Sequence, residues 1–218
     1  MRIFQLFLVF IIFFSPLTAQ NEPLTSNFLF NDGLYTNFSE FSSNKPSILI
    51  DPSKLKYDLI GEENVLILKP ESEAMLDSLV SGTAWGICIG QVPYIRTDDK
   101  QDNRLYYVKL HVVGKLSYFY YKAFREKEVT MFVHNPYTGE RIAKKSITNR
   151  DLVFIQRLLH FQTGETIDFN YDNLKAWTTD DKGLSKSLDE MKPEEREGKL
   201  FKTLLIYNDR NPVYAGEH

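Results

Sequence analysis

The chain has 218 residues, a formal net charge of −3 and 14% aromatic residues. Its hydrophobic fraction of 43% is ample for a packed core and excludes a disordered chain. The mildly acidic balance gives no electrostatic case for nucleic acid, whose binding normally needs a clustered basic face, so we expect no nucleic-acid partner.

The first 19 residues have the layout of a secretory signal peptide. Arg2 is followed by residues 3–14, which are apolar except for Gln5, and then by Pro16 and small residues. This run is shorter than the roughly 20 residues that span a bilayer, so we expect cleavage between Ala19 and Gln20. The mature chain is then predicted to be exported, to the periplasm or the extracellular space, without a transmembrane anchor.

The next segment predicts a turn, one short helix and two strands. The turn is expected at Asp32-Gly33, and the helix over residues 37–44, with Asn37 as its cap and Pro46 as its limit. Residues 47–51 and 64–69 are short apolar runs, which are typical of strands covered on both faces. Residues 72–80 predict one or two helical turns.

Residues 85–95, WGICIGQVPYI, contain the only cysteine of the chain, Cys88. A strand here, turning at Gly90-Gln91, would place small residues on one face (Ala84, Gly86, Cys88 and Gly90) and larger ones on the other (Trp85, Ile87 and Ile89). A face of small residues suits a strand against which bulky groups pack. Because no histidine or basic residue is nearby in sequence to lower the pKa of Cys88, we predict a buried, unreactive thiol.

The middle of the chain alternates between two faces. Residues 105–113 predict a strand with Tyr106, Val108, Leu110 and Val112 on one face and Tyr107, Lys109, His111 and Val113 on the other. Gly114 is expected to mark a bulge or bend. Beyond it, Leu116, Tyr118 and Tyr120 share a face.

Two hairpins are predicted to follow. Residues 128–147 should turn at residues 135–139, and residues 152–170 should turn at Thr163-Gly164. Residues 151–161 also fit a helix, with Leu152, Ile155 and Leu159 on one side. We favour the strand because a turn and an alternating segment follow directly.

The last part of the chain predicts three helices. They cover residues 170–177, residues 181–191 and a segment that opens at Pro193 and stops at Asn211-Pro212, with an apolar stripe of Leu200, Phe201, Leu204 and Leu205. The predicted fold is α+β, with a mainly antiparallel, barrel- or sandwich-like sheet and short helices. Residues 20–178 form its β-rich domain, and residues 179–218 a C-terminal helical segment packed on it.

The sequence carries no motif that predicts catalysis. Four histidines, His111, His134, His160 and His218, are too far apart for a local metal motif. Residues 53–56 match Ser-x-x-Lys but lack the companion motifs of penicillin-recognising enzymes, and residues 97–103 lack the glycine and distal glutamate of an EF-hand loop. We therefore expect no catalytic residues, no metal and no cofactor.

Five segments occur in the order found in a family of exported proteins from Bacteroidota-type bacteria, which this chain resembles. They are DGLYTNFSEFSSNKPSI, WGICIGQVPYI, YYVKLHVVGKLSYF, TGETIDFNYDNLKAW and YNDRNPVY. Ile89 stands where the family has an acid, and Lys115-Leu116 replaces an Arg-aromatic pair. The resemblance implies export and brings no catalytic residue. If the family acid is functional, this protein lacks that function.

Two classes of function remain open. The first is a non-enzymatic binding module of the cell envelope, which contacts a protein or glycan through tyrosine-rich strands containing Tyr106, Tyr107, Tyr118, Tyr120 and Tyr121. Strand alternation would place about half of these side chains in the core. The second is a hydrolase whose acids or histidines converge only in three dimensions.

Overall fold

The computed structural model describes residues 23–51, 53, 55–61, 65–69, 84–97 and 106–216. The predicted signal peptide with its expected cleavage site at Ala19–Gln20, the helix predicted at residues 72–80 and most of the 97–103 loop lie outside this set. None of the helices in the described part is both long enough and apolar enough to cross a membrane.

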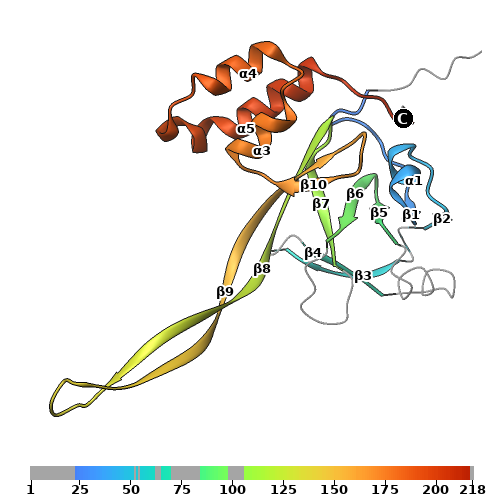
Figure 1. The fold of residues 1–218 in the computed structure, drawn as a ribbon. Coiled ribbons are helices and arrows are strands. Elements are labelled where there is room, and N and C mark those ends of the chain that lie inside the picture. The colour runs from blue at the N-terminus through green and yellow to red at the C-terminus, as the bar shows by residue number, and fades with distance from the viewer. Residues whose placement is uncertain are drawn as a thin grey trace, which may run out of the picture.

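The described strands form one antiparallel sheet (Figure 1). In chain order they are β1 (Gly33–Tyr35), β2 (Ile48–Leu49), β3 (Lys56–Ile60), β4 (Val65–Lys69), β5 (Gly86–Ile89), β6 (Val92–Arg96), β7 (Tyr106–Val112), β8 (Leu116–His134), β9 (Arg141–His160) and β10 (Thr166–Asp168). Their order is β10-β9-β8-β7-β6-β5-β1-β2, and β4 pairs with both β3 and β7.

Four helices accompany the sheet in the described residues: α1 (Phe38–Ser42), α3 (Tyr171–Trp177), α4 (Lys182–Asp189) and α5 (Pro193–Arg210). The predicted cap is confirmed at α1, where Asn37 accepts the Glu40 N–H at 2.9 Å. Asn170 and Asp181 cap α3 and α4 in the same way. Figure 1 shows α3, α4 and α5 gathered in one layer, so this layer starts at Tyr171. The α+β class with a C-terminal helical segment is confirmed.

Three apolar clusters hold the layers together. The first contains Phe30 and Phe41 from the N-terminal part with Cys88, Val108 and other sheet residues. The second includes Ile87 and Tyr107, which alternate with Cys88 and Val108 along β5 and β7 and therefore lie on the opposite face. In the third, Leu116, Tyr118 and Leu158 pack against the helical layer through Leu174, Leu184, Leu204 and Tyr207.

The predicted alternation around Gly114 is confirmed except at the end of β7. Tyr106, Val108 and Leu110 belong to the first cluster and Tyr107 to the second, while Leu116, Tyr118 and Tyr120 all pack in the third. Val112 and Val113 were predicted wrongly, because Val112 packs in the third cluster and Val113 against the first. Gly114 lies in the bend between β7 and β8, and the ladder between these strands shifts its register between Leu110 and Val112. Asn208 of α5 lies over this bend and pairs its side-chain amide with the backbone N–H and C=O of Leu116, both at 2.9 Å.

Several local predictions were wrong. Of residues 47–51 only Ile48–Leu49 form a strand, and Leu49 is 80% exposed because β2 is the edge of the sheet. The proposed turn at Asp32-Gly33 is instead the start of β1, and β3 was missed. On α5, Leu200 and Leu204 of the predicted stripe pack in the third cluster beside Tyr207, as expected. Phe201 and Leu205 are exposed, because the packed face of the helix includes only one side of the predicted stripe.

The predicted small-residue face of residues 85–95 is confirmed at Gly86 and Cys88. The prediction is wrong for Ala84 and Trp85, which precede the strand. A Cβ on Gly86 would lie 2.9 Å from the Tyr94 carbonyl oxygen and 3.6 Å from the Phe41 ring, so this position has room only for glycine. Strand β5 begins only at Gly86, so Ala84 and Trp85 do not follow its alternation and lie in the second and first clusters. Gly90 and Gln91 both have positive φ and form the predicted turn.

Strands β8 and β9 form a long hairpin that extends beyond the rest of the molecule (Figure 1). They pair from Leu116↔His160 to His134↔Arg141, with an irregularity at Val133/His134. The predicted turns at residues 135–139 and at Thr163-Gly164 are both confirmed, and residues 151–161 are almost entirely strand, not helix. The two predicted hairpins share one continuous strand, β9.

The two ends of the described chain are joined to each other. Pro23 forms an isolated antiparallel bridge with Tyr214, and the Leu24 N–H donates to the Val213 carbonyl at 2.8 Å. In Figure 1 these ends lie on the side of the molecule away from the end of the β8–β9 hairpin.

Candidate functional site: a projecting hairpin arm

The tyrosines predicted to bind a partner do not form one surface. Tyr107, Tyr118 and Tyr121 are buried, with at most 6% of each exposed, so these three were wrong as contact residues. The Tyr118 hydroxyl donates to Gln156 Oε1 at 2.7 Å, which satisfies its polar end inside the fold. Tyr106 and Tyr120 are half-buried, and Tyr120 stacks on His111 with 4.2 Å between ring centroids. Three of the five side chains are therefore in the core, in line with the expectation that strand alternation would bury about half of them.

Cys88 is fully buried, as predicted. Its Sγ lies 3.7 Å from the Phe30 carbonyl oxygen. Burial, followed by the nearby Asp32 carboxylate, raises the pKa of the thiol, so the neutral form is favoured and the thiolate needed for nucleophilic chemistry is not.

The most connected group of titratable side chains joins the sheet to the helical layer. Lys115 Nζ lies 2.5 Å from Asp180 Oδ2, and the Tyr207 hydroxyl donates to Asp180 Oδ1 at 2.8 Å. The Lys115 ammonium also lies 5.4 Å from the centre of the Tyr207 ring. Positions 115, 180 and 207 are far apart in sequence, which is why sequence reasoning missed this cluster.

The pKa shifts in this cluster favour the ordinary charge states. Burial opposes charge on Lys115 and Asp180, but their mutual contact and the Tyr207 hydroxyl outweigh it, so the pKa of Lys115 is raised and the pKa of Asp180 is lowered. Burial raises the pKa of Tyr207 to about 12. Catalytic acids and bases have pKa values moved towards neutrality, and these groups move away from it. We therefore interpret the cluster as structural.

Metal binding has no support in the described residues either, since none of their His, Cys, Asp and Glu side chains gather in groups of three or more suited to hold an ion.

The outer part of the β8–β9 hairpin projects from the sheet, and packing within the described residues does not account for its length. We call residues 124–152 the arm. All of its residues are exposed except Val129 and Asn135, which are half-buried. Over the arm each strand pairs only with the other, as far as the described residues reach. A two-stranded ribbon without a covering layer is marginally stable in water, so the arm depends on the strands it continues.

Local contacts order the arm without burying it. The guanidinium of Arg150 lies over the Phe124 ring at 4.6 Å, and that of Arg141 over the Phe132 ring at 4.3 Å. At the turn, Asn135 Oδ1 accepts the Tyr137 N–H at 2.9 Å, and Gly139 has a φ of 72°. Cation–π contacts of this exposed kind contribute about 0.5–1 kcal/mol each.

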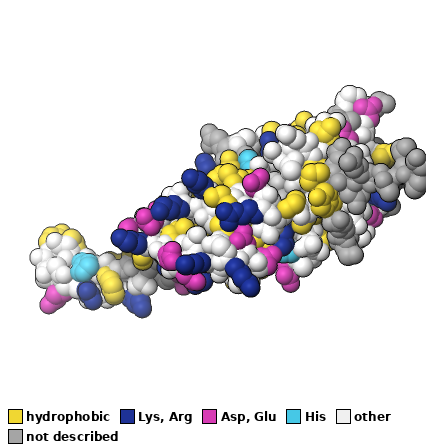
Figure 2. Space-filling model, turned by 90° about the horizontal axis from the view of Figure 1, so that it is seen from above, with side chains coloured by type: hydrophobic (Ala, Val, Ile, Leu, Met, Phe, Trp, Pro, Cys, Tyr) yellow, Lys and Arg dark blue, Asp and Glu magenta, His cyan; other side chains and the backbone are white. Residues whose placement is uncertain are grey.

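The far end of the arm combines exposed apolar and basic side chains. We call residues 131–145 the tip. Its large apolar residues expose 44–95% of their surface: Met131 51%, Phe132 44%, Val133 45%, Tyr137 95% and Ile142 62%. The tip also carries Arg141, Lys144 and Lys145 against the single acid Glu140, which is a net charge of +2 (three bases minus one acid). Figure 2 shows hydrophobic and basic side chains together at this end of the molecule.

The rest of the arm has no such charge excess. Residues 124–130 and 146–152 contain three bases, Arg125, Lys127 and Arg150, and three acids, Glu126, Glu128 and Asp151.

Comparison with models of protein families, with curated proteins and with solved structures found no match.

Proposed function

We propose that this protein is an exported, non-enzymatic binding module of the cell envelope, and that the arm is the part that contacts its partner. The observation that carries the proposal is the exposure of the arm together with the large apolar residues of the tip. Three consecutive exposed apolar residues, Met131, Phe132 and Val133, are a liability for solubility unless they have a use.

The shape of the arm supports binding. Its two strands continue from a base that is packed between the first and third clusters, so the arm is presented by a rigid support. A projecting ribbon offers both of its faces and both of its edges to a partner, which a strand inside the sheet does not.

The directions of the pKa shifts at Lys115, Asp180 and Tyr207 favour this function over the hydrolase alternative, because they leave none of these groups ready to exchange a proton near neutral pH.

The test removes the arm without disturbing its base. Glu126 and Arg150 are register partners, so residues 127–149 are replaced by Asn-Gly, a pair suited to a two-residue hairpin turn. The intact protein should capture a specific component from envelope extracts, and the shortened protein should not. The free energy of unfolding should change by less than about 1 kcal/mol, because no side chain between these positions is fully buried. Equal capture by both proteins would contradict the proposal.

Export is tested separately. Secreted material should begin at Gln20 when its N-terminus is sequenced, because Ala19 is the small residue that ends the signal segment. Recovery of the chain only in the membrane fraction with Met1 intact would contradict this part of the proposal.

A further inference from the structure

We propose that the partner of the tip is an anionic lipid surface, which the tip enters end-on to the depth of the headgroups. This inference rests on the proposed function, since it names the partner of the same arm. It is carried by the distribution of apolar side chains at the tip, by the basic residues beside them and by the polar residues that follow.

The apolar residues of the tip surround the ribbon instead of covering one face. Met131 and Val133 lie on one face of β8 and Phe132 on the other, because successive strand residues alternate. Tyr137 lies in the turn and Ile142 on the opposite strand. A protein docked on one face of the ribbon would leave Phe132 or its two neighbours in water. The boundary between headgroups and acyl chains, entered by the end of the hairpin, contacts all of them.

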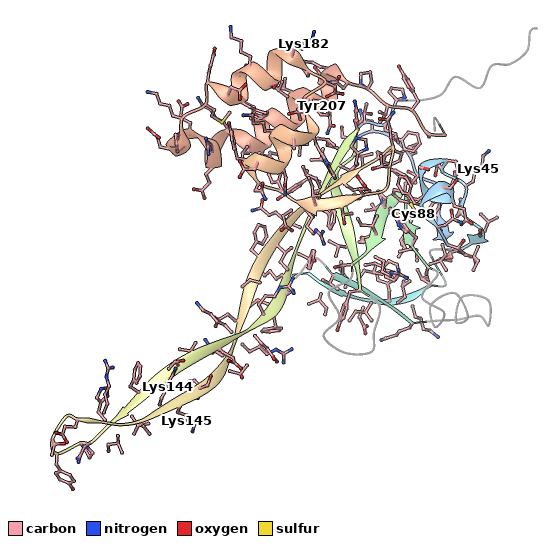
Figure 3. The ribbon with its side chains drawn as sticks, viewed as in Figure 1. Lys45, Cys88, Lys144, Lys145, Lys182 and Tyr207 are labelled. Carbon is pink, nitrogen blue, oxygen red and sulfur yellow. The ribbon has the colours of Figure 1, made fainter. Side chains whose placement is uncertain are left out.

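Basic side chains lie at the same height along the ribbon. Lys144 is the register partner of Phe132, and Lys145 is the register partner of Met131 (Figure 3). Lysine reaches outward from an apolar contact and keeps its ammonium group in the headgroup layer. Arg141, whose guanidinium covers one face of Phe132, provides a third cation close to the turn. Anionic headgroups attract such a cluster, whereas neutral headgroups do not.

The polar pairs behind the tip limit the depth of insertion. Thr130 faces Ser146, and Glu128 faces Thr148. At about 3.3 Å per residue, Met131 lies roughly 10 Å behind the end of β8, and the turn at residues 135–139 extends beyond that end. The Thr130–Ser146 pair therefore stays outside a segment that is buried to roughly 5–10 Å. Because the outer backbone edges of a two-stranded ribbon have no place in hydrocarbon, deeper entry is unfavourable. The tip is also the part of the arm farthest from the helical layer (Figure 1), so the body does not obstruct its approach.

Vesicle flotation tests the inference. Phosphatidylcholine vesicles with and without phosphatidylglycerol are mixed with the exported form, without residues 1–19, because residues 3–14 are apolar enough to bind lipid themselves. Anionic vesicles should bind at least about tenfold more tightly than neutral ones, and added salt should weaken the binding. Lys144→Glu/Lys145→Glu should lower the affinity at least about tenfold, and Phe132→Ser should lower it at every salt concentration.

The matched control changes the net charge by the same amount, but at residues outside the arm. Lys45→Glu/Lys182→Glu replaces two lysines far from the tip (Figure 3), and it should alter the affinity by less than about threefold, since charges beyond a Debye length are screened. Tyr137→Trp introduces a tryptophan whose emission should shift to shorter wavelengths on anionic vesicles, after subtraction of the signal of Trp85 and Trp177. Three results would each overturn the inference: an equal loss of affinity in the tip variant and in the control variant, equal affinity for neutral and anionic vesicles, or unshifted emission from the introduced tryptophan.

Other outcomes separate this inference from the proposed function. If vesicle binding is absent while capture from envelope extracts still requires the arm, the lipid inference is wrong and the proposed function stands. If sedimentation without lipid shows a dimer that disappears on arm shortening, a second copy is the partner and the lipid inference is overturned. If removal of the arm changes neither vesicle binding nor capture, both proposals fail.

Discussion

The inner and outer halves of the β8–β9 hairpin are built from the same two strands and the same ladder, yet their surroundings are opposite. In the inner half, Leu116, Tyr118 and Leu158 are buried between the sheet and the helical layer. In the outer half, the residues of the arm are almost all exposed. The pairing therefore continues where burial ends. Hydrogen bonds between strands maintain the shape of the arm, while packing at its base provides the free energy that holds the strands together.

Leucine truncation should give the largest difference between the two halves. Leu158 and Leu152 lie on one strand six positions apart and thus on the same face, but Leu158 is fully buried and Leu152 is 45% exposed. Leu158→Ala should lower the free energy of unfolding by about 2–5 kcal/mol, since it leaves a cavity. Leu152→Ala should lower it by less than about 1 kcal/mol. Denaturant titrations measure both, and similar losses would refute the contrast.

A second effect concerns the bend that starts the hairpin. A Cβ on Gly114 would lie 2.6 Å from Cγ of Asn208, whose amide is held by its two bonds to Leu116. Gly114→Ala should therefore destabilise the fold by about 1–3 kcal/mol. The loss should shrink in an Asn208→Ala background, and thermal unfolding of the double-mutant cycle measures the coupling.

Gly198 is the control for the Gly114 substitution. It lies within α5, and an added Cβ would meet nothing within 4 Å. Gly198→Ala should stabilise the protein by about 0.5–1 kcal/mol, because alanine loses less backbone entropy in a helix. A loss of stability here would show that the helical layer is packed differently.

The reactivity of a cysteine should differ between the buried position of Cys88 and the exposed surface of the arm. Cys88→Ala should cost about 1–2 kcal/mol, as small core truncations do. In the native protein, iodoacetamide should label Cys88 slowly, because the thiol is buried and its pKa is raised. A cysteine placed in the arm by Ile142→Cys, in the Cys88→Ala background, should react rapidly. Comparable rates at the two positions would mean that Cys88 is reachable.

A further small effect is expected at the contact between the sheet and the helical layer. Asp180→Asn removes the charge that faces the partly buried Lys115, and should cost about 1 kcal/mol after allowance for solvent screening at the half-exposed Asp180. Asp58→Asn is the control, because both partners of the Lys69–Asp58 pair are more than half exposed, and it should cost close to nothing.

The pH dependence follows from the sign of the shift at Asp180. Its pKa is lowered in the folded state, so its contribution is present above the pKa of the unfolded chain, about 3.9, and is lost as the pH falls through the folded value. The stability of the unsubstituted protein should therefore fall more steeply below about pH 4 than that of Asp180→Asn. Parallel curves from urea titrations at several pH values would contradict this assignment.

The sequence predicted the strands that lie between apolar clusters, because alternation leaves a strong signal where one face is buried. Tyr106 to Leu110 and Leu116 to Tyr120 are the clearest cases. β3 was missed because its residues are largely exposed and carry no such alternation. The first short helix was predicted from its cap at Asn37, which is a local feature.

The candidate site was only partly predictable. The turn at residues 135–139 has a local signature, but exposure of the arm depends on whether another layer covers the ribbon, which is a matter of distant residues. Val129, Met131 and Val133 alternate with Thr130 and Phe132 much as residues of core strands do. For the same reason alternation did not separate the buried Tyr107, Tyr118 and Tyr121 from a binding surface.

The bridge between Pro23 and Tyr214 has a topological consequence. Because the two ends of the described chain meet, a short linker would close this part of the protein into a ring without stretching it. The turn at residues 135–139 then becomes a natural position for new termini, since exposed loop tips tolerate chain breaks best. Such a circular permutant would keep every ladder of the body and divide the arm into two free strands. The same bridge means that a label fused at either end of the described chain is carried on the side away from the tip.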